Sequence, residues 1–338
     1  MIVFAFTAYV VFLGAAPGQG ETAASATPLE KAVERGLKFL ADDAAKWRTD
    51  HECATCHHGA MTVWAFSEAV QRGIPIQAEQ AAEMSSWTKT QFWKGIDQPR
   101  DPRPGWNLVK LPTIYLAVLA QQTPEQGVLS RDEVAQAAAH IARHQEADGF
   151  WSTPPPRNGP PPVFESPEVL TLWACAALDP RDPNPTVRES RENAARWLNK
   201  APRGEDLQAA LLRLLIDVRL EQPPDAIQPQ IDKIFQRQQA DGGWGQVKDL
   251  ASDAFATGQA LFILNQTGIK SDRPEIEWAV AFLVSHQNEN GSWPMTSRAQ
   301  PGEKPFTNPV PITYFGSAWA TIGLLRCLPE QKQPGAPR

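Results

Sequence analysis

Two kinds of helical segment alternate along this chain of 338 residues, and the alternation restricts the folds that it can adopt. The first kind is amphipathic: in 29–47, Leu37 and Leu40 fall on one face of a helix and Lys38 falls on the other. The second kind, such as 254–264, is apolar on every side and must be covered all round. No segment follows the two-residue period of a half-buried strand over any length. The pattern therefore predicts two concentric layers of helices.

Six pairs of helices follow from this pattern. The predicted pairs, with the outer helix first, are 29–47 with 60–73, 79–93 with 110–121, 131–145 with 166–178, 186–199 with 205–220, 228–239 with 252–267, and 274–287 with 311–328. Six outer and six inner helices close into a single all-α (α/α)6 toroid, which we assign to residues 27–330.

A seven-residue motif, Gln-x-x-x-Gly-x-Trp, occurs three times, each time at the end of an outer helix. The copies begin at Gln145, Gln238 and Gln287. The glycine permits the left-handed backbone that ends a helix, and the glutamine amide can satisfy helix-end groups. The indole covers apolar surface. We therefore interpret these residues as structural.

The three copies resemble the QW repeats of squalene-hopene and oxidosqualene cyclases. The six helix pairs are similar to the α/α barrel of these enzymes, which protein prenyltransferase β subunits share. The resemblance covers roughly residues 29–328, as one barrel rather than the two of the cyclases. It implies the fold and an apolar, isoprenoid-like small molecule as a ligand, but repeats of this kind identify an activity poorly.

The sequence Cys53-Ala54-Thr55-Cys56-His57 lies between the first outer and the first inner helix, in a predicted haem-attachment loop at 51–59. Two thiols one short turn apart can add to the two vinyl groups of haem, and the adjacent imidazole can reach the iron. We therefore predict haem c, bound by Cys53 and Cys56, with His57 as the proximal iron ligand.

The context of this motif, Cys-x-x-Cys-His-His after a helix that ends in Trp, also resembles exported bacterial squalene-cyclase-like proteins with a c-type haem motif. This resemblance implies electron transfer with a redox partner, or haem-assisted action on an apolar ligand. Whether the chain is an enzyme is left open by these features.

Other interpretations of the motif are a zinc site and a disulfide. Cys53 and Cys56 could bind zinc together with His57, His58 or His51, because a Cys₂His₂ ligand set is chemically sound. Alternatively, the two cysteines could form a disulfide in an exported protein. In either case the toroid would be a binding protein without redox chemistry, or a cyclase-like or prenyltransferase-like enzyme in which the motif is a structural staple.

The sixth ligand of the predicted haem iron is not determined by the sequence. The chemically competent side chains are Met61, Met84, His51, His286 and Met295. A methionine ligand would give a higher reduction potential than a second histidine.

Terpene cyclisation of the protonating type needs an acidic Asp-x-Asp-Asp cluster on an inner helix, and the chain contains no such cluster. Ser252 and Asp253, at the start of a predicted inner helix, resemble the end of that motif without its key acid. Asp253 is a weak candidate acid, and its alternative role is to cap the helix. The aromatic residues predicted to line an apolar cavity are Trp64, Tyr115, Trp173, Phe255, Tyr314, Phe315 and Trp319.

The first residues indicate export. An apolar run at 2–16 is followed by the small residues Ala24-Ser25-Ala26, as in a secretory signal peptide, which we assign to 1–26. The run is too short for a comfortable membrane span, so we expect no span after cleavage and a periplasmic or other extracytoplasmic location. Residues 331–338 are predicted to be a disordered tail. The net charge of −6, without a basic run, argues against nucleic-acid binding.

Overall fold

The structure is a computed structural model, and it describes residues 26–51, 53–94, 96–97, 109–152, 162–163, 166–295, 298 and 309–329. The predicted signal peptide, 1–26, lies outside these residues except for Ala26, and the predicted tail, 331–338, lies outside them entirely. Within the described ranges the chain forms helices and turns but no strand, and no helix there has both the length and the hydropathy of a membrane span.

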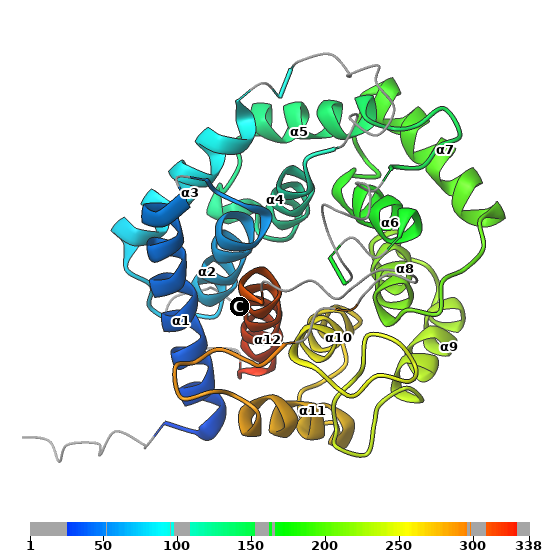
Figure 1. Cartoon of the computed structure of the whole chain (residues 1–338). Helices are drawn as coiled ribbons and strands as arrows, with labels where there is room; N and C mark the ends of the chain where they lie inside the picture. Colours follow the sequence, from blue (N-terminus) through cyan, green and yellow to red (C-terminus); the bar gives the residue numbers. More distant parts are fainter. Residues whose placement is uncertain are drawn as a thin grey trace, which may run out of the picture.

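Twelve α-helices form two concentric rings, as Figure 1 shows. The outer ring consists of α1 (Pro28–His51), α3 (Ala78–Trp93), α5 (Arg131–Arg143), α7 (Pro185–Lys200), α9 (Pro224–Phe235) and α11 (Pro274–Ser285). The inner ring consists of α2 (Thr62–Gln71), α4 (Leu111–Gln122), α6 (Pro167–Ala177), α8 (Leu207–Arg219), α10 (Ala254–Gln266) and α12 (Val310–Cys327). Two short helical turns, η1 (Cys56–Met61) and η2 (Pro124–Gln126), complete the described elements. The predicted (α/α)6 toroid is confirmed.

Local sequence signals explain where the outer helices begin. Thr27 and Glu30 form a capping box at the start of α1, in which Thr27 N donates to Glu30 Oε2 at 2.7 Å and Glu30 N donates to Thr27 Oγ1 at 3.2 Å. Ser130 and Glu133 do the same at the start of α5. The inner helix α10 differs in its surroundings: every residue from Ala254 to Leu264 is buried, as expected for a helix without a polar face.

The glutamine of each repeated motif joins two neighbouring outer helices. In the third copy, the Gln287 side chain donates to Gly291 O at 3.0 Å and to Ala32 O of α1 at 2.9 Å. The Trp293 indole N–H donates to Leu283 O at 2.7 Å, which ties the turn to the end of α11. The other two copies form the corresponding glutamine bonds, from Gln145 to Gly149 and Ser190 and from Gln238 to Gly242 and Glu275. The structural interpretation of the motif is confirmed.

The third copy also closes the ring, because it joins α11, the last outer helix, to α1, the first (Figure 1). Gly291 has φ +88°, and a Cβ atom there would lie 2.2 Å from Arg35 O of α1. Only glycine combines this backbone conformation with such a close approach. The turn after α11 therefore closes the outer ring, while α12 also joins α1, where the Tyr314 hydroxyl donates to Leu40 O at 2.8 Å.

Aromatic side chains of the inner helices pack against one another across the barrel. Trp64 of α2 lies 6.1 Å from Tyr115, 6.3 Å from Trp173 and 5.3 Å from Trp319, measured between ring centroids. These four side chains are fully buried. At this level the rings therefore fill the barrel with one another, and the predicted apolar cavity does not lie between them.

Candidate functional site

The Cys-x-x-Cys-His sequence lies where the chain turns from α1 into α2. Helix α1 continues to His51, beyond its predicted end, and the η1 turn (Cys56–Met61) leads directly into α2. The predicted loop 51–59 is therefore wrong in extent, since the connection between helices is shorter. The physical reason is a local cap: Thr55 Oγ1 accepts a hydrogen bond from His58 N at 3.2 Å and starts the turn.

Aromatic side chains surround the two histidines that follow the motif. The Trp47 indole is stacked between His51 and His58, with ring centroids 3.7 and 4.4 Å away. His57 meets Trp47 edge-on at 5.0 Å and Phe315 of α12 at 5.8 Å. His58 is fully buried, and His57 is 7% exposed. These rings hold both imidazoles in place and keep most water away from them.

A chain of hydrogen bonds joins Asp43 of α1 to both histidines. Asp43 Oδ2 lies 2.8 Å from His58 Nε2, and His58 Nδ1 contacts His57 Nδ1. A carboxylate only accepts hydrogen bonds, so His58 carries its proton on Nε2. A neutral His58 then accepts at Nδ1, and His57 donates from its own Nδ1. His57 is left with a free lone pair on Nε2.

The electrostatic surroundings keep the His57 imidazole neutral. Burial, together with smaller contributions from the neighbouring His58 and His51, lowers the pKa of His57 to about 2. Burial also lowers the pKa of His58, although its hydrogen bond to Asp43 acts in the opposite direction. A neutral imidazole with a free Nε2 lone pair is the form that binds a metal ion.

The thiols differ in their surroundings. Cys53 is free and exposed, and its carbonyl oxygen accepts a hydrogen bond from the Trp47 indole at 2.9 Å. The side chain of Cys56 lies outside the described part of the structure. Cys175 and Cys327 are free thiols within the helical layers, where burial raises the pKa of each to about 12. Among the described side chains, no three His, Cys, Asp or Glu residues gather as a metal-binding group, so the zinc alternative stays a prediction.

The predicted sixth ligands lie in different parts of the toroid. His51 stacks on Trp47, whereas Met61 and Met84 are buried in the helical layers. His286 lies on the outer ring, where its Nδ1 is 2.8 Å from the carbonyl of Phe282. Met295 packs on Gly316, where a Cβ atom would lie 2.6 Å from its Sδ. Gly316 follows Phe315, which contacts His57, so Met295 shares this part of the barrel end.

Asp253, the weak candidate for a catalytic acid, is the N-cap of α10. Its Oδ1 accepts from Ala256 N at 2.8 Å, and its Oδ2 accepts from the Gln246 side chain at 2.7 Å. Burial raises the pKa of Asp253 to about 6. Among the described residues no second carboxylate is hydrogen-bonded to it. Asp253 therefore caps α10. It does not form the hydrogen-bonded pair of carboxylates that a cyclase acid needs.

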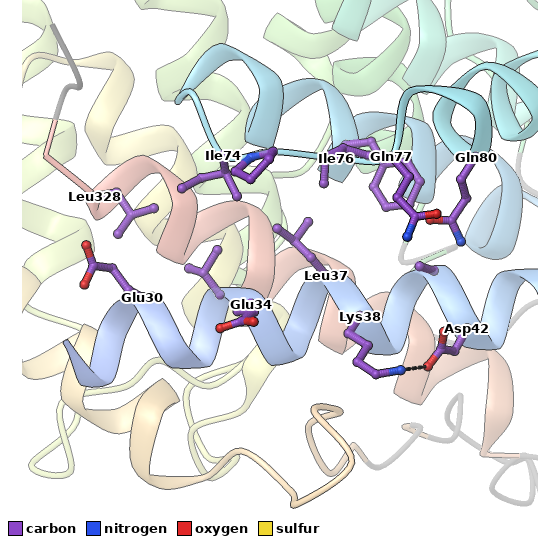
Figure 2. A pocket seen from close by; sticks show the side chains of 14 residues that line it. Glu30, Glu34, Leu37, Lys38, Asp42, Ile74, Ile76, Gln77, Gln80 and Leu328 are labelled. Atoms are coloured by element: carbon purple, nitrogen blue, oxygen red, sulfur yellow. Dashed lines mark hydrogen bonds and ion pairs between the residues drawn. The ribbon is translucent and has the colours of Figure 1, made fainter. Parts of the chain in front are cut away.

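A surface groove of about 730 Å³ runs along α1, and Figure 2 shows its lining. Leu37, Ile74 and Ile76 contribute apolar side chains, while Lys38 forms an ion pair with Asp42 at 2.5 Å at the edge. None of the motif residues lines this groove. It is a feature separate from the histidine site.

Asp43 and Trp47 were not recognised as parts of the site from the sequence. A signal for them exists, because Asp43, Trp47 and His51 are spaced four residues apart and share one face of α1. Their connection with His57 and His58 required the turn at η1, which brings the two segments together.

Part of this chain is similar to known squalene-cyclase sequences. Residues 199–336 match the family model of the squalene-hopene cyclase C-terminal domain. Drimenyl diphosphate synthase from Streptomyces showdoensis is 26% identical over 198 residues, which are 59% of this chain. The match covers only 28% of that protein's length.

Solved structures share the toroid. The type II terpene cyclase MstE from Scytonema, in its apo form, is 16% identical with a TM-score of 0.50, over 88% of this chain and 98% of that one. A variant of MstE in complex with geranylgeranyl dihydroxybenzoate, its substrate, is 15% identical with a TM-score of 0.52, over 89% of this chain and 97% of that one. A possible member of the GH105 family from Klebsiella pneumoniae is 11% identical with a TM-score of 0.54, over 95% of this chain and 98% of that one. At such identities the likeness concerns the fold, which does not select one chemistry.

Proposed function

Because this chain is a squalene-cyclase-like α/α toroid whose barrel is filled by aromatic side chains, we propose that its function lies at the barrel end, in a c-type haem bound by Cys53, Cys56 and His57. Haem, when bound, supplies one-electron redox chemistry, and the axial ligands and their hydrogen bonds tune its potential. The proposed role is electron transfer with a redox partner outside the cytoplasm.

The observation that carries this proposal is the hydrogen-bonded chain from Asp43 through His58 to His57. A histidine that binds a metal through one nitrogen usually donates the other N–H to an acceptor, which fixes its tautomer and orientation. Here that acceptor is His58 Nδ1, and the Nε2–H group of His58 in turn donates to Asp43. This arrangement supports His57 Nε2 as the proposed ligand of a haem iron.

The exposure of Cys53 supports covalent attachment. Its side chain is accessible from solvent, as a maturation enzyme requires, whereas Cys175 is only partly exposed and Cys327 is buried. The location is part of the same proposal, because attachment of this kind takes place outside the cytoplasm and residues 1–26 have the pattern of a signal peptide.

When haem is bound, Met295 would be the second side chain that holds the iron. It packs on Gly316, next to Phe315, and Phe315 contacts the His57 ring. His286, by contrast, lies on the outer ring with its Nδ1 against the carbonyl of Phe282. A thioether ligand would raise the reduction potential relative to a second histidine.

The test is to express the full chain in a bacterial periplasm together with the haem c maturation machinery. We expect a coloured protein whose haem absorbance survives denaturation and extraction with acidified acetone, and a porphyrin adduct on the peptide 48–60. The Cys53→Ser, Cys56→Ser double variant should lose the covalent haem. Cys175→Ser is the matched control, because it removes a thiol elsewhere and should keep the haem. A colourless wild-type protein that is correctly exported and folded would refute the proposal.

A second candidate function is cyclisation of an isoprenoid. The observation that favours it is Asp253, a buried carboxyl whose pKa is raised to about 6, within the segment that matches the squalene-hopene cyclase domain. A carboxyl with this pKa is partly protonated near neutral pH and could act as a general acid. Against it stand the packed aromatic side chains of the barrel and the absence of a hydrogen-bonded second carboxylate among the described residues.

This second function is tested by incubating the purified protein with squalene and with a prenyl diphosphate, followed by mass spectrometry of the extract. Cyclic products from wild type, lost in Asp253→Asn and retained in the Cys53→Ser, Cys56→Ser variant, would support it. Unchanged substrate in all samples would exclude cyclisation of these two compounds, without affecting the haem proposal.

A further inference from the structure

A polar pocket lies where the inner helices end, at the opposite end of the barrel from His57. It has a volume of about 250 Å³. Its lining comes from the last residues of four inner helices and from the turn after α6. These residues are Gln121, Gln122, Asp179, Pro180, Arg181, Arg219, Gln266 and Arg326. Neither the proposed haem site nor the aromatic barrel uses any of them.

Three side chains of this pocket have buried hydrogen-bond donors without a partner in the described structure. They are Gln122 Nε2 at the end of α4, Arg219 Nη2 at the end of α8 and Gln266 Nε2 at the end of α10. Buried donors are almost always satisfied in native proteins, because an unpaired one loses its hydrogen bonds to water without replacement. Three of them around one pocket indicate that a ligand with several acceptor atoms completes the site.

The charges of the lining favour an anionic ligand. Arg326 is paired with the buried Glu68 at 2.7 Å, and Arg181 is paired with Asp179 at 3.3 Å. Arg219 has no such carboxylate partner in the described structure, since its Nη1 donates to the carbonyl of Ala176. Burial lowers the pKa of Arg219 to about 10, although the negative charge of Asp179 acts in the opposite direction, and the guanidinium stays charged at neutral pH. One positive charge thus remains without a paired carboxylate.

We propose that this pocket binds a phosphoryl group, either as free phosphate or as the head of a phosphate ester. The oxyanion accepts from the unpaired donors of Gln122, Arg219 and Gln266. The pocket also contains two acceptors, the unpaired Gln122 Oε1 and the carboxylate of Asp179. Phosphate at neutral pH carries a hydroxyl that can donate to such acceptors, and a phosphate ester carries one in its monoanionic form, whereas sulfate carries none. The site should therefore prefer phosphate over sulfate.

The test measures binding of inorganic phosphate to the full chain by calorimetry and by the shift in melting temperature at neutral pH and constant ionic strength. A ligand that binds only the folded state raises the melting temperature. We expect saturable binding of phosphate and at least about tenfold weaker binding of sulfate, the difference that one hydrogen bond to a charged group can make. Methyl phosphate distinguishes a phosphate ester from free phosphate as the ligand. If methyl phosphate binds, a phosphate ester is supported; if only inorganic phosphate binds, the free ion is supported.

Two kinds of variant separate binding from folding. Gln266→Leu removes an unpaired buried donor, so the free protein should be as stable as wild type or more stable, while phosphate affinity should fall about tenfold. Arg219→Met should abolish the phosphate-induced shift. Arg188→Met is the matched control, since it removes one exposed arginine of α7 and should keep full affinity. Equal binding of phosphate and sulfate, no saturable binding, or unchanged affinity in Gln266→Leu would overturn the proposal.

Discussion

Gly291 lies where the outer ring of the toroid closes, and substitution by alanine measures the energy of that close contact. The left-handed conformation at φ +88° costs an alanine about 1–2 kcal/mol. The new Cβ would lie 2.2 Å from Arg35 O, so α11 and α1 must move apart. Strain from such overpacking costs about 1–3 kcal/mol, and loss of the Gln287 bond to Ala32 O adds about 1 kcal/mol or more. We expect Gly291→Ala to lower the free energy of unfolding by about 3–6 kcal/mol.

Gly268 provides the matched control. Its φ is +83°, nearly the same as that of Gly291, but a Cβ atom there would meet nothing within 4 Å. Gly268→Ala should therefore cost only the conformational part, about 1–2 kcal/mol. Both values come from urea unfolding followed by tryptophan fluorescence, with the slope against urea checked for constancy. If the two variants are destabilised equally, the close approach to α1 contributes nothing and the explanation of ring closure is wrong.

Three further predictions concern buried ionisable groups. Glu68→Gln should lower the free energy of unfolding by about 3–5 kcal/mol, because it leaves the charge of Arg326 buried without its partner; a urea titration that gives less than 1 kcal/mol would contradict this. His140 has its pKa lowered to about 4 by burial, so below pH 6.5 the unfolded chain takes up a proton that the folded chain does not. Stability should therefore fall as the pH drops from 6.5 to 4, by up to about 3 kcal/mol from this residue, and an unchanged slope in His140→Gln would show that another group is responsible. Asp43→Asn should redistribute the proton of His57 between its two nitrogens, which ¹⁵N NMR spectra of the haem-free protein would show. It should also shift the reduction potential of the haem-loaded protein. Spectra and potentials identical to those of wild type would exclude a positioning role for Asp43.

Much of the fold could be predicted from the sequence because it is encoded locally. A helix without a polar face, such as α10, must be inner, and an amphipathic one, such as α1, must be outer. The repeated glutamine, glycine and tryptophan mark the turns by their own backbone and hydrogen-bonding preferences. For this reason the order of the helices, the number of pairs and the single barrel were predictable, and the motif residues Cys53, Cys56 and His57 could be identified as candidates.

The tertiary structure decided which side chains meet. Asp43 and His58 are joined only because η1 folds back on α1, and the donors of Gln122, Arg219 and Gln266 gather only because the inner helices end at one level. The barrel filled by aromatic rings is likewise a consequence of packing, since each ring is positioned by helices distant in the sequence. The periodicity of apolar residues indicates which layer a helix occupies. Hydrogen bonds and ring contacts, however, depend on distances of a few ångströms between segments, and these distances are set only when the toroid closes.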